Sequence, residues 1–166
     1  DDAVRINANP SDTLFVAQEI AAYAKDKNFD LILMGRESTD VNSAAVHGMV
    51  AEILGIPSVS PIMKLELNGT TASVNREIEG GTESLELSTP FVAGCQEPIA
   101  EWKIPNMRGI MSARTKPLAV VESSTSDKAT ELNNYTTPPA RSACKMIDKD
   151  NVAELVNLLR NEAKVI

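Results

Sequence analysis

The residues best placed for ligand chemistry lie where a predicted strand leads into a predicted helix. The run 29–33 is almost entirely apolar, as in a parallel strand covered on both faces, and the polar segment Gly35–Val46 comes after it. Ser43, Ala44 and Ala45 are small enough for a phosphate to approach the backbone, and the first N–H groups of a helix attract anions. The segment has no Walker sequence and no glycine triplet. The pattern therefore leaves two interpretations open, a nucleotide site and a plain connection.

His47, the one histidine of the sequence, lies in the same predicted helix. As a general base it would need an activated nucleophile and an orienting carboxylate such as Asp40; otherwise it packs beside the loop. Asp40 itself suits either the electrostatics of the helix start or a contact to a ribose. Cys95 has no basic neighbour, which favours an inert thiol. Four glutamates form either a carboxylate cluster or the solvated face of a hairpin: Glu77, Glu79, Glu83 and Glu86.

Large apolar residues are concentrated in the stretch 96–111, which also contains two prolines. They include Trp102, Ile104, Met107 and Met111. Residues of these types are enriched at the centres of protein interfaces, and methionine adapts to several partners. Folding under the domain explains the same residues equally well, so a core role and a docking role both stay open.

Composition excludes several classes of protein. The 166 residues carry a net charge of −7, which argues against a nucleic-acid binder with a basic surface. Two cysteines and one histidine provide neither a disulfide framework nor the usual zinc ligands, so we expect no metal site. No apolar run approaches ~20 residues, so we expect no membrane insertion. Because no targeting signal is visible, we expect a cytoplasmic protein.

Hydrophobic periodicity predicts an α/β protein with an open sheet. Elements alternate along the first part of the chain, with strands at 4–6, 29–33 and 58–63 and helices at 13–27 and 44–54. Ser11 or Asp12 would cap the first of these helices.

The pattern then changes to antiparallel strands. The two-residue turns Asn68-Gly69 and Gly80-Gly81 predict a meander. Residues 95–117 are expected to be irregular, and 118–121 to form a last strand. We expect three parts along the chain: an α/β nucleotide-binding domain at 1–121, a linker or arm at 122–149, and a C-terminal helix at 150–166 capped by Asp148 or Asp150.

Four ordered segments resemble those of electron-transfer flavoprotein β subunits. Residues 31–40, LILMGRESTD, are similar to the strand and "GKQAID" loop of that family, and 76–83, REIEGGTE, to its "REIEGG" hairpin. Residues 104–117 resemble its "LPNIMKAKKKP" segment, and 138–142 resemble the start of its C-terminal arm. Together the four segments span almost the whole chain.

The resemblance implies an adenine nucleotide alpha hydrolase-like open sheet, mostly parallel, with an antiparallel hairpin insert and a C-terminal arm plus helix. It implies a heterodimer with an α subunit that holds most of the redox FAD, while the β subunit binds AMP or a second FAD. Such a carrier accepts electrons from flavoprotein dehydrogenases, such as acyl-CoA dehydrogenases, and passes them to a quinone reductase or another acceptor. It is no enzyme by itself. The alternative is a non-redox regulatory module that binds an adenine nucleotide.

The matching segments assign residues to two roles, with no catalytic residue. The cofactor-binding set is Gly35, Arg36, Glu37, Ser38, Thr39, Asp40, Val41, Asn42, Ser43, Ala44, Ala45 and Val46. The partner-docking set is Ile104, Pro105, Met107, Ile110, Met111 and Glu77.

The chain departs from the family pattern at four places. Residues 44–47, AAVH, replace a glutamine-containing end of the loop, and 96–100, QEPIA, replace "NEPRY" without its arginine. Met107-Arg108 is an insertion. The family's first strand-helix-strand portion has no counterpart, so we expect a β subunit that lacks its N-terminal part.

Overall fold

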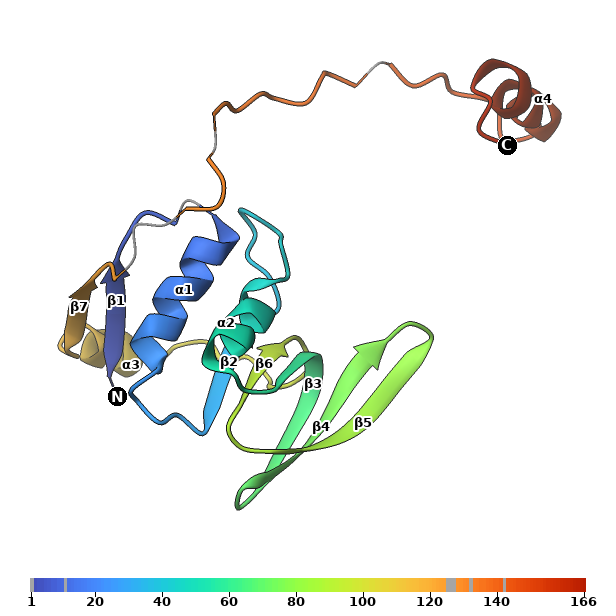
Figure 1. The fold of residues 1–166 in the computed structure, drawn as a ribbon. Helices are drawn as coiled ribbons and strands as arrows, with labels where there is room; N and C mark the ends of the chain where they lie inside the picture. Colours follow the sequence, from blue (N-terminus) through green and yellow to red (C-terminus); the bar gives the residue numbers. More distant parts are fainter. Residues whose placement is uncertain (1, 11, 125–127, 132, 142) are drawn as a thin grey trace. The chain divides into compact units, whose positions relative to one another are not determined.

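The computed structural model describes residues 2–10, 12–124, 128–131, 133–141 and 143–166. The chain divides into two compact units, Asp1–Leu132 and Asn133–Ile166. The first unit contains both sheets and the larger helices, and the second contains the C-terminal helix (Figure 1). Ser11, one of the two expected caps, lies outside the described residues.

A parallel three-stranded sheet with helices on one face forms the centre of the first unit. Strands β2 (Leu31–Gly35) and β3 (Ser58–Asn68) both pair in parallel with β6 (Phe91–Cys95), which lies between them. Helices α1 (Thr13–Ala24) and α2 (Val46–Leu54) pack against each other beside it (Figure 1). These pairings, together with the meander described below, confirm the expected α/β class and its mostly parallel sheet.

An apolar cluster packs on each face of this sheet. The helix-side cluster is built on buried Ala17, Ala21, Val50, Ala51 and Val92. The other face carries a second cluster of Val59, Ile62, Ala72, Val74, Phe91 and Ala93. Neighbouring residues of β6 therefore alternate between the two clusters, as side chains on a strand must.

The antiparallel meander continues from the same sheet, in the order β3, β4 (Thr71–Ile78) and β5 (Gly81–Ser88). Both predicted hairpins are confirmed, but each two-residue turn lies one position from the predicted pair, at Gly69-Thr70 and at Glu79-Gly80. Gly69 and Gly80 adopt left-handed φ values of +63° and +84°, which suit such turns. We expected a strand end near residue 63, which was wrong. β3 runs on past a register shift between Ile62 and Lys64. Its first residues pair with β6, Ile62 pairs with both β6 and β4, and residues 64–68 pair with β4.

A separate two-stranded sheet is formed by the ends of the first unit. β1 (Ala3–Asn7) pairs in parallel with β7 (Leu118–Glu122), far away in the sequence. Within the described residues this pair joins neither β2 nor β3.

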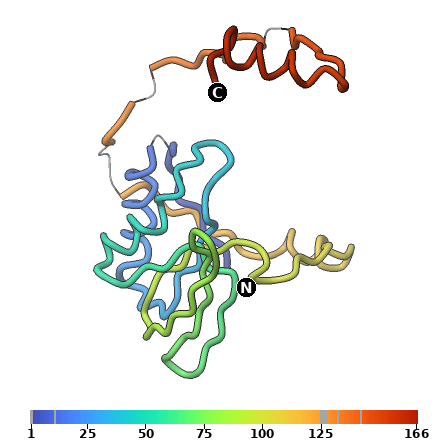
Figure 2. The backbone as a smooth tube through the Cα atoms, turned by 90° about the vertical axis from the view of Figure 1, so that its right-hand side faces the viewer, coloured from blue at the N-terminus to red at the C-terminus, as the bar shows by residue number. Residues whose placement is uncertain are grey.

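Helix α3 (Met107–Ala113) lies where the sequence predicted irregular chain, and that expectation was wrong. The Asn106 side chain caps it by accepting a hydrogen bond from the Gly109 N–H at 2.8 Å. No described side chain of α3 is buried. The stretch that carries it, yellow in Figure 2, extends away from the strands of its unit.

The segment after β7 is attached to α1 by two carboxylates. Glu19, 5% exposed, accepts hydrogen bonds from the Ser124 N–H and the Ser123 hydroxyl, each at 3.0 Å. Asp12 accepts from the N–H groups of Ala129 and Thr130 at 3.0 and 3.3 Å. The first part of the expected linker therefore belongs to the first unit.

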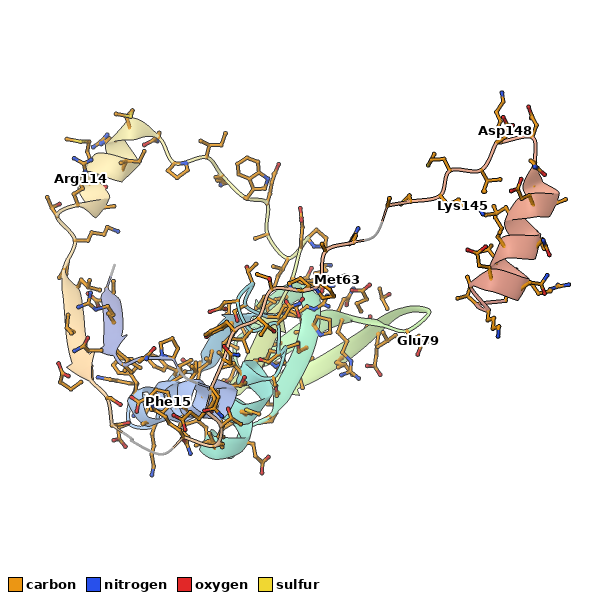
Figure 3. All side chains as sticks on the ribbon, turned by 90° about the horizontal axis from the view of Figure 1, so that it is seen from above. Phe15, Met63, Glu79, Arg114, Lys145 and Asp148 are labelled. Atoms are coloured by element: carbon orange, nitrogen blue, oxygen red, sulfur yellow. The ribbon has the colours of Figure 1, made fainter. Side chains whose placement is uncertain are left out.

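The second unit contains α4 (Val152–Asn157), which continues into the π-helical turn η1 (Leu158–Glu162). Asn151 caps α4, so our choice of Asp148 or Asp150 was wrong. Asp148 instead accepts a hydrogen bond from the Asp150 N–H at 2.9 Å. Lys145, labelled in Figure 3, lies 3.9 Å from Glu162.

Candidate functional site

A pocket of about 340 Å³ opens at the carboxyl end of β2, between the first residues of α1 and those of α2. This position is typical of ligand sites in open α/β sheets. The segment from the end of β2 to the start of α2 forms one wall, and Pro10, Asp12 and Thr13 form another. Apolar residues of α1 and β2 contribute to its lining: Val16, Ile20 and Met34.

Most residues of the expected cofactor-binding set line this pocket. Thr39 and Asn42 are not among the lining residues. The members that line it are Gly35, Arg36, Glu37, Ser38, Asp40, Val41, Ser43, Ala44, Ala45 and Val46.

The two helix starts differ in what they offer a ligand. At α1 the Asp12 carboxylate accepts from the Phe15 N–H at 2.8 Å, so a side chain already occupies that end. At α2 the cap residue is Ala45, and no side chain in the described part of the chain caps the helix. The first N–H groups of α2 are therefore available to an anion, with the helix dipole behind them.

The loop that precedes α2 contains two residues with left-handed backbone conformation. Asn42 and Ala44 have φ values of +56° and +50°, and for a residue with a side chain such a conformation costs roughly 1–2 kcal/mol. The surrounding loop maintains this shape next to Ser43 and Ala45. The small side chains leave the backbone itself facing the pocket, as contact with a phosphate requires.

The charged side chains of the pocket are mostly acidic. Asp12, Glu37 and Asp40 line it, and Arg36 is the one basic side chain among its described lining residues. The hydrogen bond from the Phe15 N–H lowers the pKa of Asp12, and the Ser38 hydroxyl lowers that of Asp40. Both carboxylates are ionised at neutral pH, so a phosphate depends on Arg36 and on backbone N–H groups.

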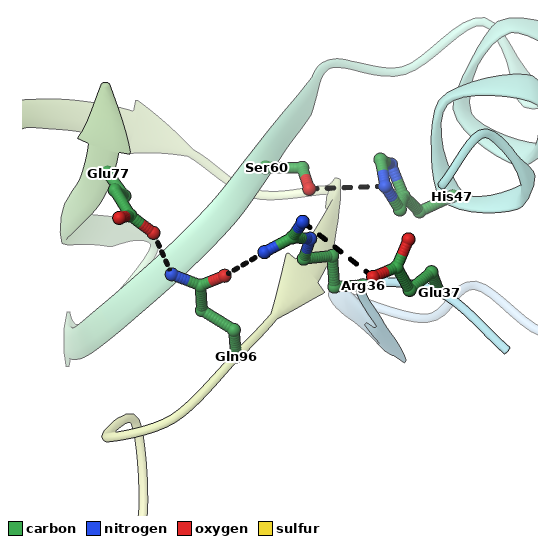
Figure 4. A network of polar contacts seen from close by, with 6 residues as sticks. All are labelled: Arg36, Glu37, His47, Ser60, Glu77 and Gln96. Carbon is green, nitrogen blue, oxygen red and sulfur yellow. Dashed lines mark hydrogen bonds and ion pairs between the residues drawn. The ribbon is translucent and has the colours of Figure 1, made fainter. Parts of the chain in front are cut away.

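Arg36 also takes part in a chain of polar contacts (Figure 4). Its Nη1 donates to Gln96 Oε1 at 3.0 Å, and Gln96 Nε2 donates to Glu77 Oε2 at 2.5 Å. Its Nη2 lies 3.7 Å from Glu37 Oε1. Glu77, expected in partner docking, is thus connected to the pocket through Gln96, a residue that the sequence did not single out for this role.

His47 packs behind the pocket and is not among its lining residues. It is 8% exposed, and its Nε2 lies 3.1 Å from the Ser60 hydroxyl (Figure 4). Burial lowers its pKa, so the ring is neutral at pH 7. A Cβ on Gly94 would lie 2.3 Å from Ser60 Oγ, which shows how closely the pair is enclosed. These contacts support the packing role for His47.

Cys95 and the glutamates of the meander provide no reactive or metal-binding group. Burial raises the pKa of the Cys95 thiol, which keeps it protonated. Among the described residues, no cluster of three or more His, Cys, Asp or Glu is arranged to hold a metal ion. In that same part of the chain, no helix is long and apolar enough to cross a membrane.

The apolar side chains from Trp102 to Met111 are exposed, so they do not belong to the core of the described residues, and their docking role stays a prediction. Ile104 is 78% exposed, and Trp102, Met107, Ile110 and Met111 are also exposed, as is Pro105. Ile99, at the start of the stretch, packs against the cluster around Phe91. The stretch is therefore held to the sheet by Ile99 at its beginning, and its later apolar side chains are exposed to solvent.

The sequence missed the α1 half of the pocket. Pro10, Asp12 and Thr13 lie more than twenty positions before the predicted loop, and only the packing of α1 against α2 brings them together. The one available signal was Asp12, which was recognised as a helix cap and not as part of a site.

Comparison with known proteins identifies the family. Residues 4–126 match the model of the electron transfer flavoprotein domain. The chain is 36% identical over 181 aligned residues to the electron transfer flavoprotein subunit beta of Bacillus subtilis (strain 168), covering all of this chain and 70% of that protein. It is 35% identical over 152 residues to the subunit beta of Syntrophomonas wolfei, covering 90% of this chain and 60% of that protein. The chain belongs to the electron transfer flavoprotein family, in the group of its β subunits.

Proposed function

We propose that this chain is the β subunit of a heterodimeric electron carrier, and that its pocket holds the phosphate of AMP or of the adenosine half of a second FAD. In this proposal the α subunit holds most of the FAD that carries electrons. Family membership supports the electron-carrier role. The uncapped start of α2 beside Arg36 is the observation that carries the nucleotide proposal.

The residues of the pocket fit an adenine nucleotide. The N–H groups at the start of α2 would receive the phosphate, and Ser43, Ala44 and Ala45 leave them accessible. Arg36 adds a positive charge at the rim, and the carboxylates of Asp12 and Asp40 suit ribose hydroxyls. The apolar lining of Val16, Ile20 and Met34 offers a surface for the flat adenine ring.

A bound flavin supplies the electron chemistry, since it accepts and passes on electrons while the protein supplies binding and orientation. This chain's part is to hold the nucleotide, to bind the α subunit and to present a docking surface. We propose that flavoprotein dehydrogenases, such as acyl-CoA dehydrogenases, dock at the exposed loop around Ile104, with Pro105, Met107, Ile110 and Met111, and that exposed Glu77 on β4 also takes part in docking. A quinone reductase or another acceptor then receives the electrons.

The C-terminal unit is proposed to bind the α subunit. α4 exposes Val152, Leu155 and Val156, and Val165 and Ile166 after η1 are also exposed. A helix this short is marginally stable in water by itself, and a group of exposed apolar side chains on it is typical of a surface that binds a partner.

The nucleotide content of the purified protein tests the proposal. We expect acid to release AMP or FAD from the full chain in near-stoichiometric amount, detected by chromatography. If the protein contains no nucleotide and binds neither AMP nor FAD by calorimetry, the proposed pocket function is wrong.

A further inference from the structure

Three elements contribute to one chain of hydrogen bonds at the pocket rim. Arg36 follows β2, Gln96 follows β6, and Glu77 lies on β4 of the meander (Figure 4). The Arg36 N–H also donates to the Cys95 carbonyl at 3.1 Å, which fixes its backbone beside Gln96. These hydrogen bonds therefore connect Arg36 in the pocket lining to the exposed Glu77 carboxylate on a different strand of the sheet.

The donor and acceptor groups fix the direction of each hydrogen bond between Arg36, Gln96 and Glu77. A carboxylate such as Glu77 only accepts hydrogen bonds, and a guanidinium such as that of Arg36 only donates them. Gln96 can therefore satisfy both neighbours in one orientation alone, with its NH₂ toward Glu77 and its oxygen toward Arg36. Without Glu77 the amide is free to turn, and its NH₂ would then face the donors of Arg36.

We propose that Glu77, acting through Gln96, is a positioning residue that holds the Arg36 guanidinium at the pocket rim for the phosphate of an adenine nucleotide. The inference rests on the proposed nucleotide pocket and adds to it a residue outside the pocket lining. Because coupling between two sites is reciprocal, a cationic partner group that draws Glu77 away from Gln96 weakens phosphate binding. Bound phosphate in turn weakens binding of the partner by the same factor, so release of the phosphate strengthens it.

Positioning by Glu77 and simple electrostatics predict opposite changes in the affinity for a phosphate when Glu77 is removed. Glu77→Ala removes a negative charge near the pocket, and by Coulomb's law alone a phosphate then binds more tightly. If Glu77 acts by positioning, the same change weakens the phosphate contact because Arg36 loses its fixed orientation. Glu79→Ala is the matched control, since Glu79 is an exposed glutamate two residues further along and takes no part in the hydrogen bonds that join Arg36, Gln96 and Glu77.

Calorimetric titration of the full chain with AMP and with adenosine separates these cases. For Glu77→Ala we expect AMP to bind about fivefold more weakly, with adenosine unchanged because it has no phosphate. Glu77→Gln should bind AMP nearly as well as the original protein, because its amide oxygen still accepts from Gln96. Glu79→Ala should show no loss. AMP binding by Glu77→Ala that is equal or tighter overturns the proposal, and so does a Glu77→Gln variant as weak as Glu77→Ala.

A second measurement decides the positioning without any ligand. In ¹⁵N NMR of the full chain, rotation of the Arg36 guanidinium about its Nε–Cζ bond should be severalfold faster in Glu77→Ala than in the original protein, and unchanged in Glu79→Ala. Equal rotation rates in all three proteins overturn the proposal. If the original protein binds no AMP, the nucleotide pocket is wrong, and the rotation rates still decide whether Glu77 positions Arg36.

Discussion

At the scale of single residues, Ala44 carries much of the argument for a phosphate site. Its φ of +50° turns the backbone so that α2 begins directly behind it. Proline cannot adopt this φ and has no N–H. We expect Ala44→Pro to reduce AMP binding at least tenfold, measured by calorimetry.

Glycine at the same position is the control, because it adopts a positive φ without a steric penalty. Ala44→Gly should bind AMP within about twofold of the original protein, since only the loop's flexibility changes. Unchanged nucleotide content in Ala44→Pro would sink the proposed backbone contact.

His47 makes stability depend on pH. Burial lowers its pKa below the usual 6.5, so the unfolded chain binds a proton that the folded chain resists. Its contribution to stability is complete above the unfolded pKa and is lost as the pH falls below it. We expect the free energy of unfolding, from urea titrations, to fall between pH 7.5 and 5.5.

The matched variant is His47→Asn, which keeps a polar group opposite Ser60 and does not titrate in this range. The difference between the two proteins' pH profiles isolates the histidine from the carboxylates. Parallel profiles would show that His47 has no such effect.

At the scale of elements, the loop around Ile104 is proposed to dock dehydrogenases. An electron carrier must release each partner quickly, which favours a small apolar contact. A single aliphatic side chain buries roughly 100 Å², worth about 2–3 kcal/mol at ~25 cal/mol per Å². Ile104→Ala should therefore slow electron transfer from a dehydrogenase about tenfold or more.

Thermal unfolding controls for this variant. Ile104 is 78% exposed, so its loss should leave the unfolding midpoint and the flavin content nearly unchanged. A destabilisation of several kcal/mol would instead mark Ile104 as a core residue. Undiminished electron transfer would exclude it as the docking anchor.

The C-terminal unit can be removed by truncation at a point that leaves the contacts of the first unit intact. Removing residues after Thr130 keeps the hydrogen bonds of Asp12 and Glu19 to the segment after β7. We expect this truncated chain to fold with an unchanged unfolding midpoint and to lose co-purification with the α subunit. Retained co-purification would exclude the proposed arm.

Truncation after Ser123 is the informative contrast. It removes Ser124, whose N–H and hydroxyl both donate to the buried Glu19 carboxylate. Leaving that carboxylate with fewer donors costs about 1–3 kcal/mol. This variant should therefore lose stability as well as the α subunit.

The sequence predicted those elements whose signals are local. Asp12 as a cap and the Gly69 and Gly80 turns were found because each depends on a few neighbouring residues. Helix α3 was missed because its seven residues make only two turns, too few for the spacing of Met107, Ile110 and Met111 to indicate a helical period. The extent of β3 was missed because its second half is defined by pairing with β4.

The candidate site was likewise predictable only where its signals are local. The wall from Gly35 to Val46 follows one strand and could be located from sequence, whereas the wall from Asp12 depends on how two helices pack. The contact of Gln96 with Arg36 joins residues sixty positions apart. No local pattern in the sequence indicates such a contact.

At the scale of the whole molecule, the proposed function depends on whether this chain works as one half of an electron carrier. Its relatives are named electron transfer flavoprotein subunit beta, and the chain has a pocket at the end of β2, an exposed apolar loop and an exposed C-terminal helix. We propose a separate task for each of the three: holding a nucleotide, docking a dehydrogenase and binding a second subunit.

Co-purification of this chain with an electron transfer flavoprotein α subunit decides whether it is one half of an electron carrier. The proposed function predicts a yellow one-to-one complex with a flavin absorption spectrum, bleached when an acyl-CoA dehydrogenase and its substrate are added. A colourless chain that binds AMP and never joins the α subunit would contradict it and would indicate a regulatory nucleotide-binding module.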